Sequence, residues 1–418
     1  MLAALRVVVA LCVVATWREQ RPVDVAGLPE GLLQGRLPGS GWLYELLGPT
    51  PDVVRAASVL LLAAAALLLV GLWARPAAIV TGLLGVYVLG VPQLTGKVDH
   101  YHHVVWFCFA LALGPCGDAW SVDAWRQRRH RHLVPAARSA RYGFPLGIVI
   151  VLLGIVYLLP GLAKLRTAQL RWALSDNLAN LVHLKSWELG RDPLLHVERW
   201  PVVSRAAALA LLAFEVGFFL LVLVPRLRLV AVAGGVLFHV LSAATVGIFF
   251  WSLLAAYVVF ADRAWVVGRS PPGDGRRPST ALVAGGALLV GLAVLPVLTI
   301  RPSGHAWPFA SYPTFAGLQG TSVETVAAVP VVDGAEVAAL TDDQAFGGLL
   351  PPQRYRALLD SLRDGDPSRL QAVTDGLRPT LPGGTTEVRF YRRTVSVLIG
   401  DRQGEILEER LVGAVPVD

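Results

Sequence analysis

Residues 206–224 read AAALALLAFEVGFFLLVLV, and this stretch decides the fold class. Its only ionisable side chain is Glu215. As a helix, a run of roughly 20 apolar residues can cross the ~30 Å hydrocarbon core of a bilayer. Comparable apolar runs lie at Ala56–Trp73, Ala77–Leu94, Gly143–Leu162 and Ala281–Ile300. We therefore expect an integral membrane protein that crosses the bilayer several times.

Composition and charge support this class. The chain of 418 residues is 54% hydrophobic and 16% charged, whereas soluble domains average about 25% charged residues. Residues 301–418 carry 11 arginines and 15 acidic residues, so their net charge is −4, and the +7 of the whole chain leaves +11 for the rest. A basic membrane region indicates arginine-rich cytoplasmic loops. No basic patch interleaved with aromatic residues indicates nucleic-acid binding.

The number of spans depends on the uncharged stretch Leu229–Ala261. It is too long for one span and short for two, since a single helix of this length would extend about 50 Å. Two short spans would place the basic loops Arg126–Arg141 and Arg263–Arg277 on one side of the membrane, as the positive-inside rule favours. We therefore expect an all-α transmembrane bundle of about nine spans, with the N-terminus in the cytoplasm.

The chain divides into three parts. Residues 1–265 form the main transmembrane bundle, and residues 266–300 form a cytoplasmic loop and the last transmembrane helix. Residues 301–418 form a small extracytoplasmic domain of the α+β class, soluble in water. Within it, Pro352–Arg363 is expected to be a helix. The alternating stretches Thr386–Leu398 and Glu405–Val412, separated by a glycine-containing turn, predict a hairpin.

Two ionisable residues lie inside apolar runs, Glu215 and His239. A lone charge near the middle of the bilayer costs about 3 kcal/mol or more, so it requires a partner or a polar cavity. Because the two residues occupy successive spans, they can pair. One interpretation is a structural pair that locks two helices. The other is a pair of residues that line a cavity and contact a cofactor.

Lys164 ends the fifth span and is one of three lysines, against 34 arginines, in the chain. It can be an interfacial lysine whose stem lies along apolar surface and whose ammonium reaches water. Alternatively, it is desolvated, and a desolvated lysine can be a neutral amine that acts as a general base. Arginine cannot take this role, which would explain a lysine here.

A histidine cluster precedes the fourth span, Val104–Leu113. The spacing of these histidines is poor for a metal on a helix, where positions i and i+4 are favoured. No acidic residue or cysteine completes a zinc site, and the three cysteines show no metal spacing. We therefore expect no metal site. On the expected topology the cluster lies on the same, outer side as Lys164. The histidines are His100, His102 and His103, and the cysteines are Cys12, Cys108 and Cys116.

Four short motifs occur in a characteristic order. They are the cluster Asp99–His103, the turn Gly117–Asp123, the segment Gly161–Leu165, and Phe238-His239 followed by Val246–Phe249. With these motifs in register, the region Arg18–Ala261 resembles the HTTM domain of the vitamin K-dependent gamma-carboxylase superfamily. The resemblance implies a helical bundle whose active site faces the lumen or periplasm.

The resemblance also implies a chemistry. In the carboxylase, a lysine deprotonates vitamin K hydroquinone, oxygen converts the quinol to its epoxide, and a strong base formed on the way removes a γ-proton from a peptide glutamate, to which carbon dioxide adds. The matching lysine is Lys164, and the histidine that stabilises the hydroquinone falls on His103. His239 matches a histidine within a span, with a cavity-lining role. The implied cofactor is a reduced quinone, of the vitamin K hydroquinone or menaquinol type.

This chain departs from the family pattern at several positions. The first of two consecutive family lysines is Ala163 here, and two family asparagines are Tyr101 and His102. Residues 301–418 replace a long luminal domain. The substrate therefore stays open, and three functions remain. They are a quinol-dependent enzyme of the bacterial cell membrane, an SdpB-like accessory factor for maturation or export of a secreted peptide, and a small-molecule transporter. The expected partners are the lipid bilayer, a quinol and a secreted peptide or protein.

Overall fold

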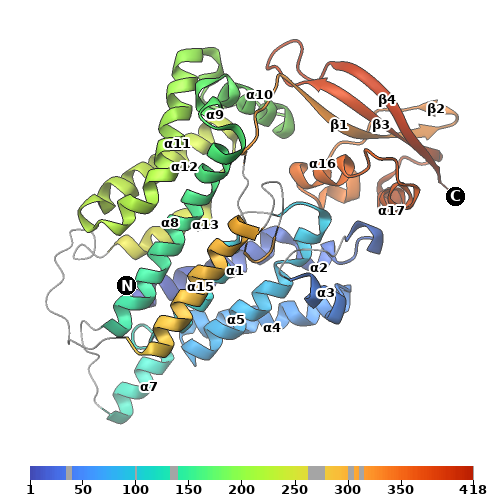
Figure 1. Ribbon diagram of the computed structural model, residues 1–418. Coiled ribbons are helices and arrows are strands. Elements are labelled where there is room, and N and C mark those ends of the chain that lie inside the picture. Colours follow the sequence, from blue (N-terminus) through green and yellow to red (C-terminus); the bar gives the residue numbers. More distant parts are fainter. Residues whose placement is uncertain are drawn as a thin grey trace.

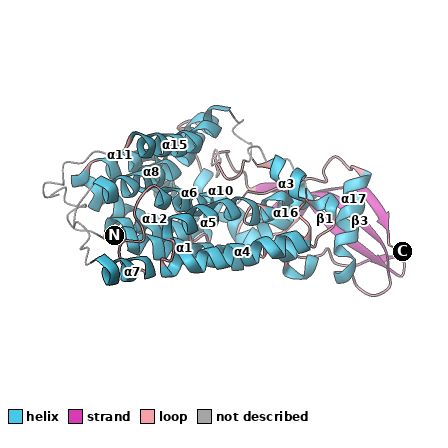
Figure 2. Cartoon of the chain, turned by 90° about the horizontal axis from the view of Figure 1, so that it is seen from below, coloured by secondary structure: helices cyan, strands magenta, loops and turns pink. Residues whose placement is uncertain are grey.

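The computed structural model of the chain describes residues 1–33, 40–98, 101–131, 140–261, 278–299, 306–309 and 315–417. Long helices form one bundle, and a four-stranded sheet lies beyond one end of it (Figure 1). The N-terminus and the short helix α7 (Val122–Arg131) lie at the opposite end of the bundle from the sheet (Figure 2). The predicted combination of a helical bundle and a small α+β domain is therefore present.

Five helical segments are long and apolar enough to cross a membrane. They are Pro51–Val70 (α4), Ala74–Thr95 (α5, Ala74–Val88, with η2, Val91–Thr95), Ala140–Ala168 (α8), Pro201–Leu223 (α11) and Pro225–Val246 (η4, Pro225–Leu227, with α12, Arg228–Val246). The apolar segments His102–Ala112 (α6), Trp251–Phe260 and Thr280–Leu295 are shorter. Helix α1 (Leu2–Gln20) packs beside α4 and α6. Within the described residues, then, five of the nine expected spans are shown.

The uncharged stretch from Leu229 breaks once, as expected, but it does not form two complete spans. Helix α12 ends where Gly247 adopts a left-handed conformation with φ of 68°, which only glycine takes without strain. Helix α13 (Trp251–Ala256) and the turn η5 (Tyr257–Phe260) follow. This second piece covers ten residues, about 15 Å of helix, and is too short to cross the bilayer.

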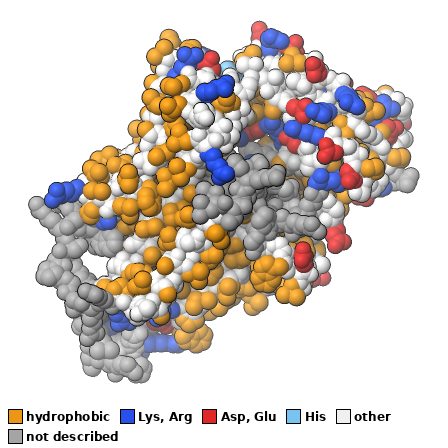
Figure 3. Space-filling model, in the orientation of Figure 1, with side chains coloured by type: hydrophobic (Ala, Val, Ile, Leu, Met, Phe, Trp, Pro, Cys, Tyr) orange, Lys and Arg blue, Asp and Glu red, His pale blue; other side chains and the backbone are white. Residues whose placement is uncertain are grey.

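The surface of the long helices is apolar. Figure 3 shows hydrophobic side chains over these helices, whereas charged side chains gather on the sheet domain. In the candidate spans α11 and α12, only 28% and 22% of residues are buried inside the molecule. Apolar side chains exposed along a helix whose backbone groups are all internally bonded suit contact with lipid. The structure therefore supports the assignment as a membrane protein.

The C-terminal domain is an antiparallel sheet with strand order β2-β1-β3-β4. Its strands are Ser322–Val332 (β1), Ala335–Glu336 (β2), Thr385–Ser396 (β3) and Ile406–Pro416 (β4). Helices α16 (Pro352–Asp360) and α17 (Pro367–Leu377) pack on it. The predicted helix and hairpin are confirmed. Strand β1 was not predicted, and neither was α17.

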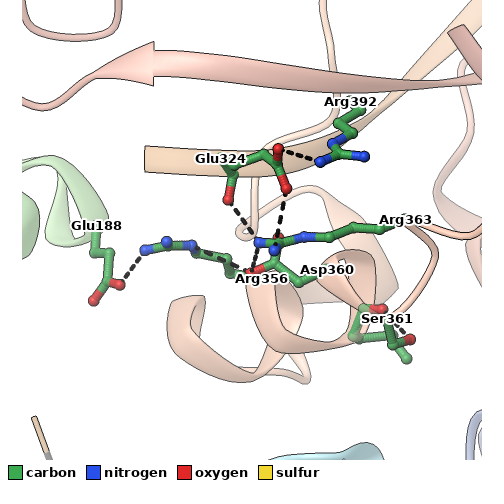
Figure 4. Close-up of polar contacts among 8 residues, drawn as sticks. Glu188, Glu324, Arg356, Asp360, Ser361, Arg363 and Arg392 are labelled. Atoms are coloured by element: carbon green, nitrogen blue, oxygen red, sulfur yellow. Dashed lines mark hydrogen bonds and ion pairs between the residues drawn. The ribbon is translucent and has the colours of Figure 1, made fainter. Parts of the chain in front are cut away.

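Polar contacts tie this domain to helix α10 (Asn177–Leu189). Arg356 of α16 bonds to Glu188 at the end of α10. Arg363 joins Asp360 and Glu324, each at 3.2 Å, so the network continues into β1 (Figure 4). A second anchor is the buried Arg354, whose guanidinium donates to the side chain of Gln20 at the end of α1. The sheet domain is thus attached to two parts of the bundle.

The contact of the hairpin with α10 is expected to depend on pH. The backbone N–H of Ile399 donates to Nδ1 of His183 at 3.2 Å. Burial lowers the pKa of His183, against an opposing effect of Glu198. A solvated histidine takes up a proton near pH 6.5, so the undocked state binds more protons there. The contact is fully present above about pH 6.5 and weakens as the pH falls from there through the lowered pKa.

Hydrogen–deuterium exchange of the hairpin amides, corrected for intrinsic rates, measures this effect. We expect lower protection of Ile399 at pH 5.5 than at pH 7.5. In the variant His183→Asn, whose amide oxygen accepts the same bond without titrating, this change should vanish. An unchanged pH dependence in that variant would contradict the assignment to His183.

Candidate functional site

A buried ion pair joins two of the predicted site residues, Lys164 of α8 and Glu215 of α11. The Nζ atom lies 2.9 Å from each carboxylate oxygen, and the two residues are 2% and 5% exposed. The helices approach closely here because α8 has a glycine: a Cβ atom on Gly161 would lie 3.0 Å from the Cβ of Glu215. Lys164 is therefore desolvated, and the interpretation as an interfacial lysine is wrong.

An aromatic ring completes the surroundings of the lysine. The Nζ of Lys164 lies 5.0 Å from the ring centroid of Trp172 in the short helix α9 (Arg171–Leu174). Such a position over a ring face favours the ammonium. The indole Nε1 of Trp172 in turn donates to the carbonyl oxygen of Phe315 at 2.7 Å. The lysine is thus fixed by a carboxylate from one side and a ring from another.

The expected pairing of Glu215 with His239 is wrong. His239 of α12 is fully buried, and its Nε2 lies 2.6 Å from the hydroxyl of Tyr157. That hydroxyl lies 2.7 Å from the hydroxyl of Tyr257. Glu215 faces Lys164 instead because α11 packs along α8. Adjacency in sequence thus did not decide which helix the carboxylate faces.

A cavity of about 310 Å³ lies beside the ion pair. Its polar lining consists of Lys164, Glu215, Tyr157, Ser242 and Thr245, and the rest of the lining is largely apolar, including rings from α11, α12 and the segment before α13. This volume is at the small end of the range for ligand sites, roughly 300–1,000 Å³. The arrangement can hold an apolar ring with its hydroxyl group at the ion pair.

The cavity reaches the apolar surface of the bundle. Among its lining residues, Leu237 and Leu241 of α12 are 57% and 41% exposed. Both lie in a segment long and apolar enough to cross the membrane. The opening beside them therefore lies on a surface suited to lipid, so a lipid-soluble molecule can reach the cavity without passing through water.

The histidine cluster lies elsewhere. His103 is buried, its Nε2 lies 3.0 Å from Oγ of Ser252, and it does not belong to the described lining of the cavity. Leu253, which follows Ser252 in the chain, does line the cavity. His103 therefore contacts the outer side of the segment that carries Leu253. His102 packs on the ring of Trp307 at 5.1 Å. His100 lies outside the described residues.

Two residues of the site were missed in the sequence, Tyr157 and Trp172. Tyr157 has a usable signal, because it lies seven residues before Lys164 and two helical turns place both on one face. Trp172 has none, since it follows the span in a short helix. Of the residues that the structure describes, no three histidine, cysteine or acidic side chains form a group that can hold a metal.

The family model of the HTTM domain matches residues 1–265 of the chain. This chain belongs to the HTTM-domain family. The resemblance to vitamin K-dependent carboxylase-like membrane proteins is therefore confirmed at the level of the family. The HTTM domain contains the ion pair and the Tyr157–His239 contact, whereas α15 (Thr280–Thr299) and the sheet domain lie outside it. Searches among curated proteins and among solved structures found no match.

Proposed function

We propose that this HTTM-domain protein is a quinol-dependent enzyme of the bacterial cell membrane, in which Lys164 and Glu215 take the proton of a ligand hydroxyl. One observation carries the proposal: a buried ion pair lines an apolar cavity whose lining includes leucines exposed on the apolar surface of the bundle. The N-terminus would lie in the cytoplasm, because the arginines of α7 are at the same end of the bundle. The sheet domain would be extracytoplasmic.

The lining suits a reduced quinone of the vitamin K hydroquinone or menaquinol type. A paired lysine and glutamate have no net charge, so the site disfavours a charged ligand that would remain without a counter-ion. The rings of Phe214, Phe238 and Phe250 belong to the walls and can pack on the faces of an aromatic ligand. An apolar tail would leave beside Leu237 and Leu241.

The ion pair can act as the acid–base group. Transfer of the ammonium proton to the carboxylate of Glu215, 2.9 Å away, would leave Nζ of Lys164 as a free amine. This amine can take a proton from a nearby hydroxyl, and the resulting ammonium stays beside the oxygen that lost it. Trp172 and Glu215 hold the ammonium in place. A bound reduced quinone would supply the electrons, and the family resemblance suggests carboxylation of a glutamate in a secreted peptide as the coupled reaction.

Turnover of the full chain in nanodiscs tests the proposal. With menaquinol-type naphthoquinols and oxygen, Lys164→Arg and Glu215→Gln are expected to lower quinol consumption by about 10²–10⁴-fold. Lys97→Arg, the same change outside the cavity lining, should leave it unaltered. Full turnover in Lys164→Arg, or no binding of any naphthoquinol by the natural chain, would overturn the proposal.

A second candidate is an SdpB-like accessory factor for maturation or export of a secreted peptide. It is favoured by strand β4, which forms one edge of the sheet and exposes Ile406, Leu407 and Leu411. An extended peptide can add to such an edge. Photo-crosslinking from position 411 in cells should then recover a secreted peptide, and the capture should survive the double variant Lys164→Met with Glu215→Leu, which removes both charges of the pair. If no peptide is recovered, or if capture is lost in that variant, this function is contradicted.

A further inference from the structure

Part of the cavity lining, Phe315, comes from outside the HTTM domain. Residues 315–319, here called the wall segment, lead into β1. Phe315, the first residue of this segment, is one of the residues that line the cavity, together with Lys164 and Trp172. Because the family match ends at residue 265, this part of the site belongs to the C-terminal region of the chain.

Side chains of α9 and α10 hold both ends of the wall segment. At its start, the carbonyl oxygen of Phe315 accepts from Nε1 of Trp172 at 2.7 Å. At its end, the N–H of Gln319 donates to Oδ1 of Asn177 at 2.6 Å, and the Gln319 carbonyl accepts from Nδ2 of Asn180 at 2.8 Å. The segment is therefore fixed to the bundle.

Phe315 lies near the end of the cavity that holds the ion pair. Trp172 contacts both, since its ring lies under Nζ of Lys164 while its Nε1 binds the Phe315 backbone. On another side, Nζ of Lys185 lies 5.0 Å from the Phe315 ring centroid. Phe315 thus lines the cavity and also contacts a second buried lysine, Lys185.

The backbone at Phe315 is in the left-handed region, with φ of 51°. A non-glycine residue there costs of the order of 1 kcal/mol or more and is retained only when the surroundings determine it. Glycine adopts this conformation without strain. The variant Phe315→Gly therefore removes the ring and keeps the backbone path.

We infer that Phe315 is a specificity-determining residue that limits the size of the ring system placed against Lys164 and Glu215. That the ligand is a quinol rests on the proposed function. The limit on ring size rests on the position of Phe315 in the cavity lining. The ligand class is a neutral aromatic diol whose ring fits between Phe315 and the ion pair. A larger ring system would collide with Phe315 before its hydroxyl reaches the pair.

Binding of two hydroquinones to the full chain in nanodiscs tests this inference. The probes are naphthalene and anthracene hydroquinone, followed without oxygen by their own fluorescence. We expect Phe315→Gly to raise the affinity for the three-ring probe, relative to the two-ring probe, by about tenfold or more. Asn177→Ala should shift the ratio less and in the same direction, because it removes one of the two bonds that hold Gln319. The control is Leu318→Ala in the same segment, where the side chain is 43% exposed and outside the lining.

The outcomes separate the inference from the proposed function. A higher ratio in Phe315→Gly and an unchanged ratio in Leu318→Ala support the size limit at Phe315. If the natural chain binds neither probe, binding of the three-ring probe by Phe315→Gly and not by Leu318→Ala supports it. An unchanged ratio in Phe315→Gly overturns the inference that Phe315 limits ring size. If the natural chain still binds a probe, the proposed quinol site stands. If no variant binds either probe, both are overturned.

Discussion

Replacing Lys164 with methionine should lower the free energy of unfolding by about 3–5 kcal/mol, because it leaves the carboxylate of Glu215 buried without its partner. Glu215→Leu should cost a similar amount for the converse reason. Both side chains are almost fully buried, and both carboxylate oxygens bond to Nζ. Unfolding of the purified protein in nanodiscs, followed by denaturant titration, measures the change.

The double variant decides what the pair contributes. Lys164→Met with Glu215→Leu removes both charges and fills the space with apolar groups, so stability should return to near the natural value. Quinol turnover should stay lost. An exposed pair, Arg55–Asp52 at 2.8 Å, is the control, and Arg55→Met should change stability by less than about 1 kcal/mol. If the free energy of unfolding falls as much in the double variant as in the single variants, the ion pair serves stability and not chemistry.

Arg6→Leu is the second substitution with a large expected effect. The guanidinium of Arg6 is fully buried in α1 and donates to three carbonyl oxygens in the turn after α6, those of Cys116, Ala119 and Trp120 at 2.8, 3.1 and 2.5 Å. The bond to Cys116 is buried and the other two are partly buried, and an orphaned buried acceptor costs about 1–3 kcal/mol. The free energy of unfolding should therefore fall by about 2–3 kcal/mol.

The surroundings of Arg6 provide the controls. Arg6→Lys keeps the charge but loses the planar fork, so it should recover only part of the loss. Arg18→Leu removes an exposed arginine from the same helix and should have little effect. Gly71 has a φ of 68°, and a Cβ atom on it would lie 2.3 Å from Cβ of Ser121 and 2.6 Å from a guanidinium nitrogen of Arg6. Gly71→Ala should therefore also destabilise this turn. A stable Arg6→Leu variant would show that water satisfies these carbonyls.

Ionisable residues in apolar runs were a reliable guide to buried polar groups, but not to their partners. Lys164, Glu215 and His239 were all singled out in the sequence, and all three are buried. Their partners lie 51 to 82 residues away, and only the packing of α8 against α11 and α12 selects them. His103 was also expected at the site, yet it does not line the cavity, because α6 directs it toward Ser252.

The small domain shows the same division. Its hairpin was predictable because alternation and a glycine turn are local signals. Strand β1 was missed because Ser322–Val332 is mostly apolar without clean alternation, and its partner β3 begins more than 50 residues later. The role of Phe315 had no local signal at all.

Local features of the chain were enough to predict the membrane class, a break within Leu229–Ala261 and the unusual lysine and glutamate, because apolar run length and isolated polar residues need no tertiary contact. The order of four short motifs was enough to predict the resemblance to the HTTM domain. The pairing of Lys164 with Glu215, and the approach of Phe315 to the same cavity, became visible only in the folded chain. Such contacts depend on which helix faces pack together, and packing is a property of the whole chain.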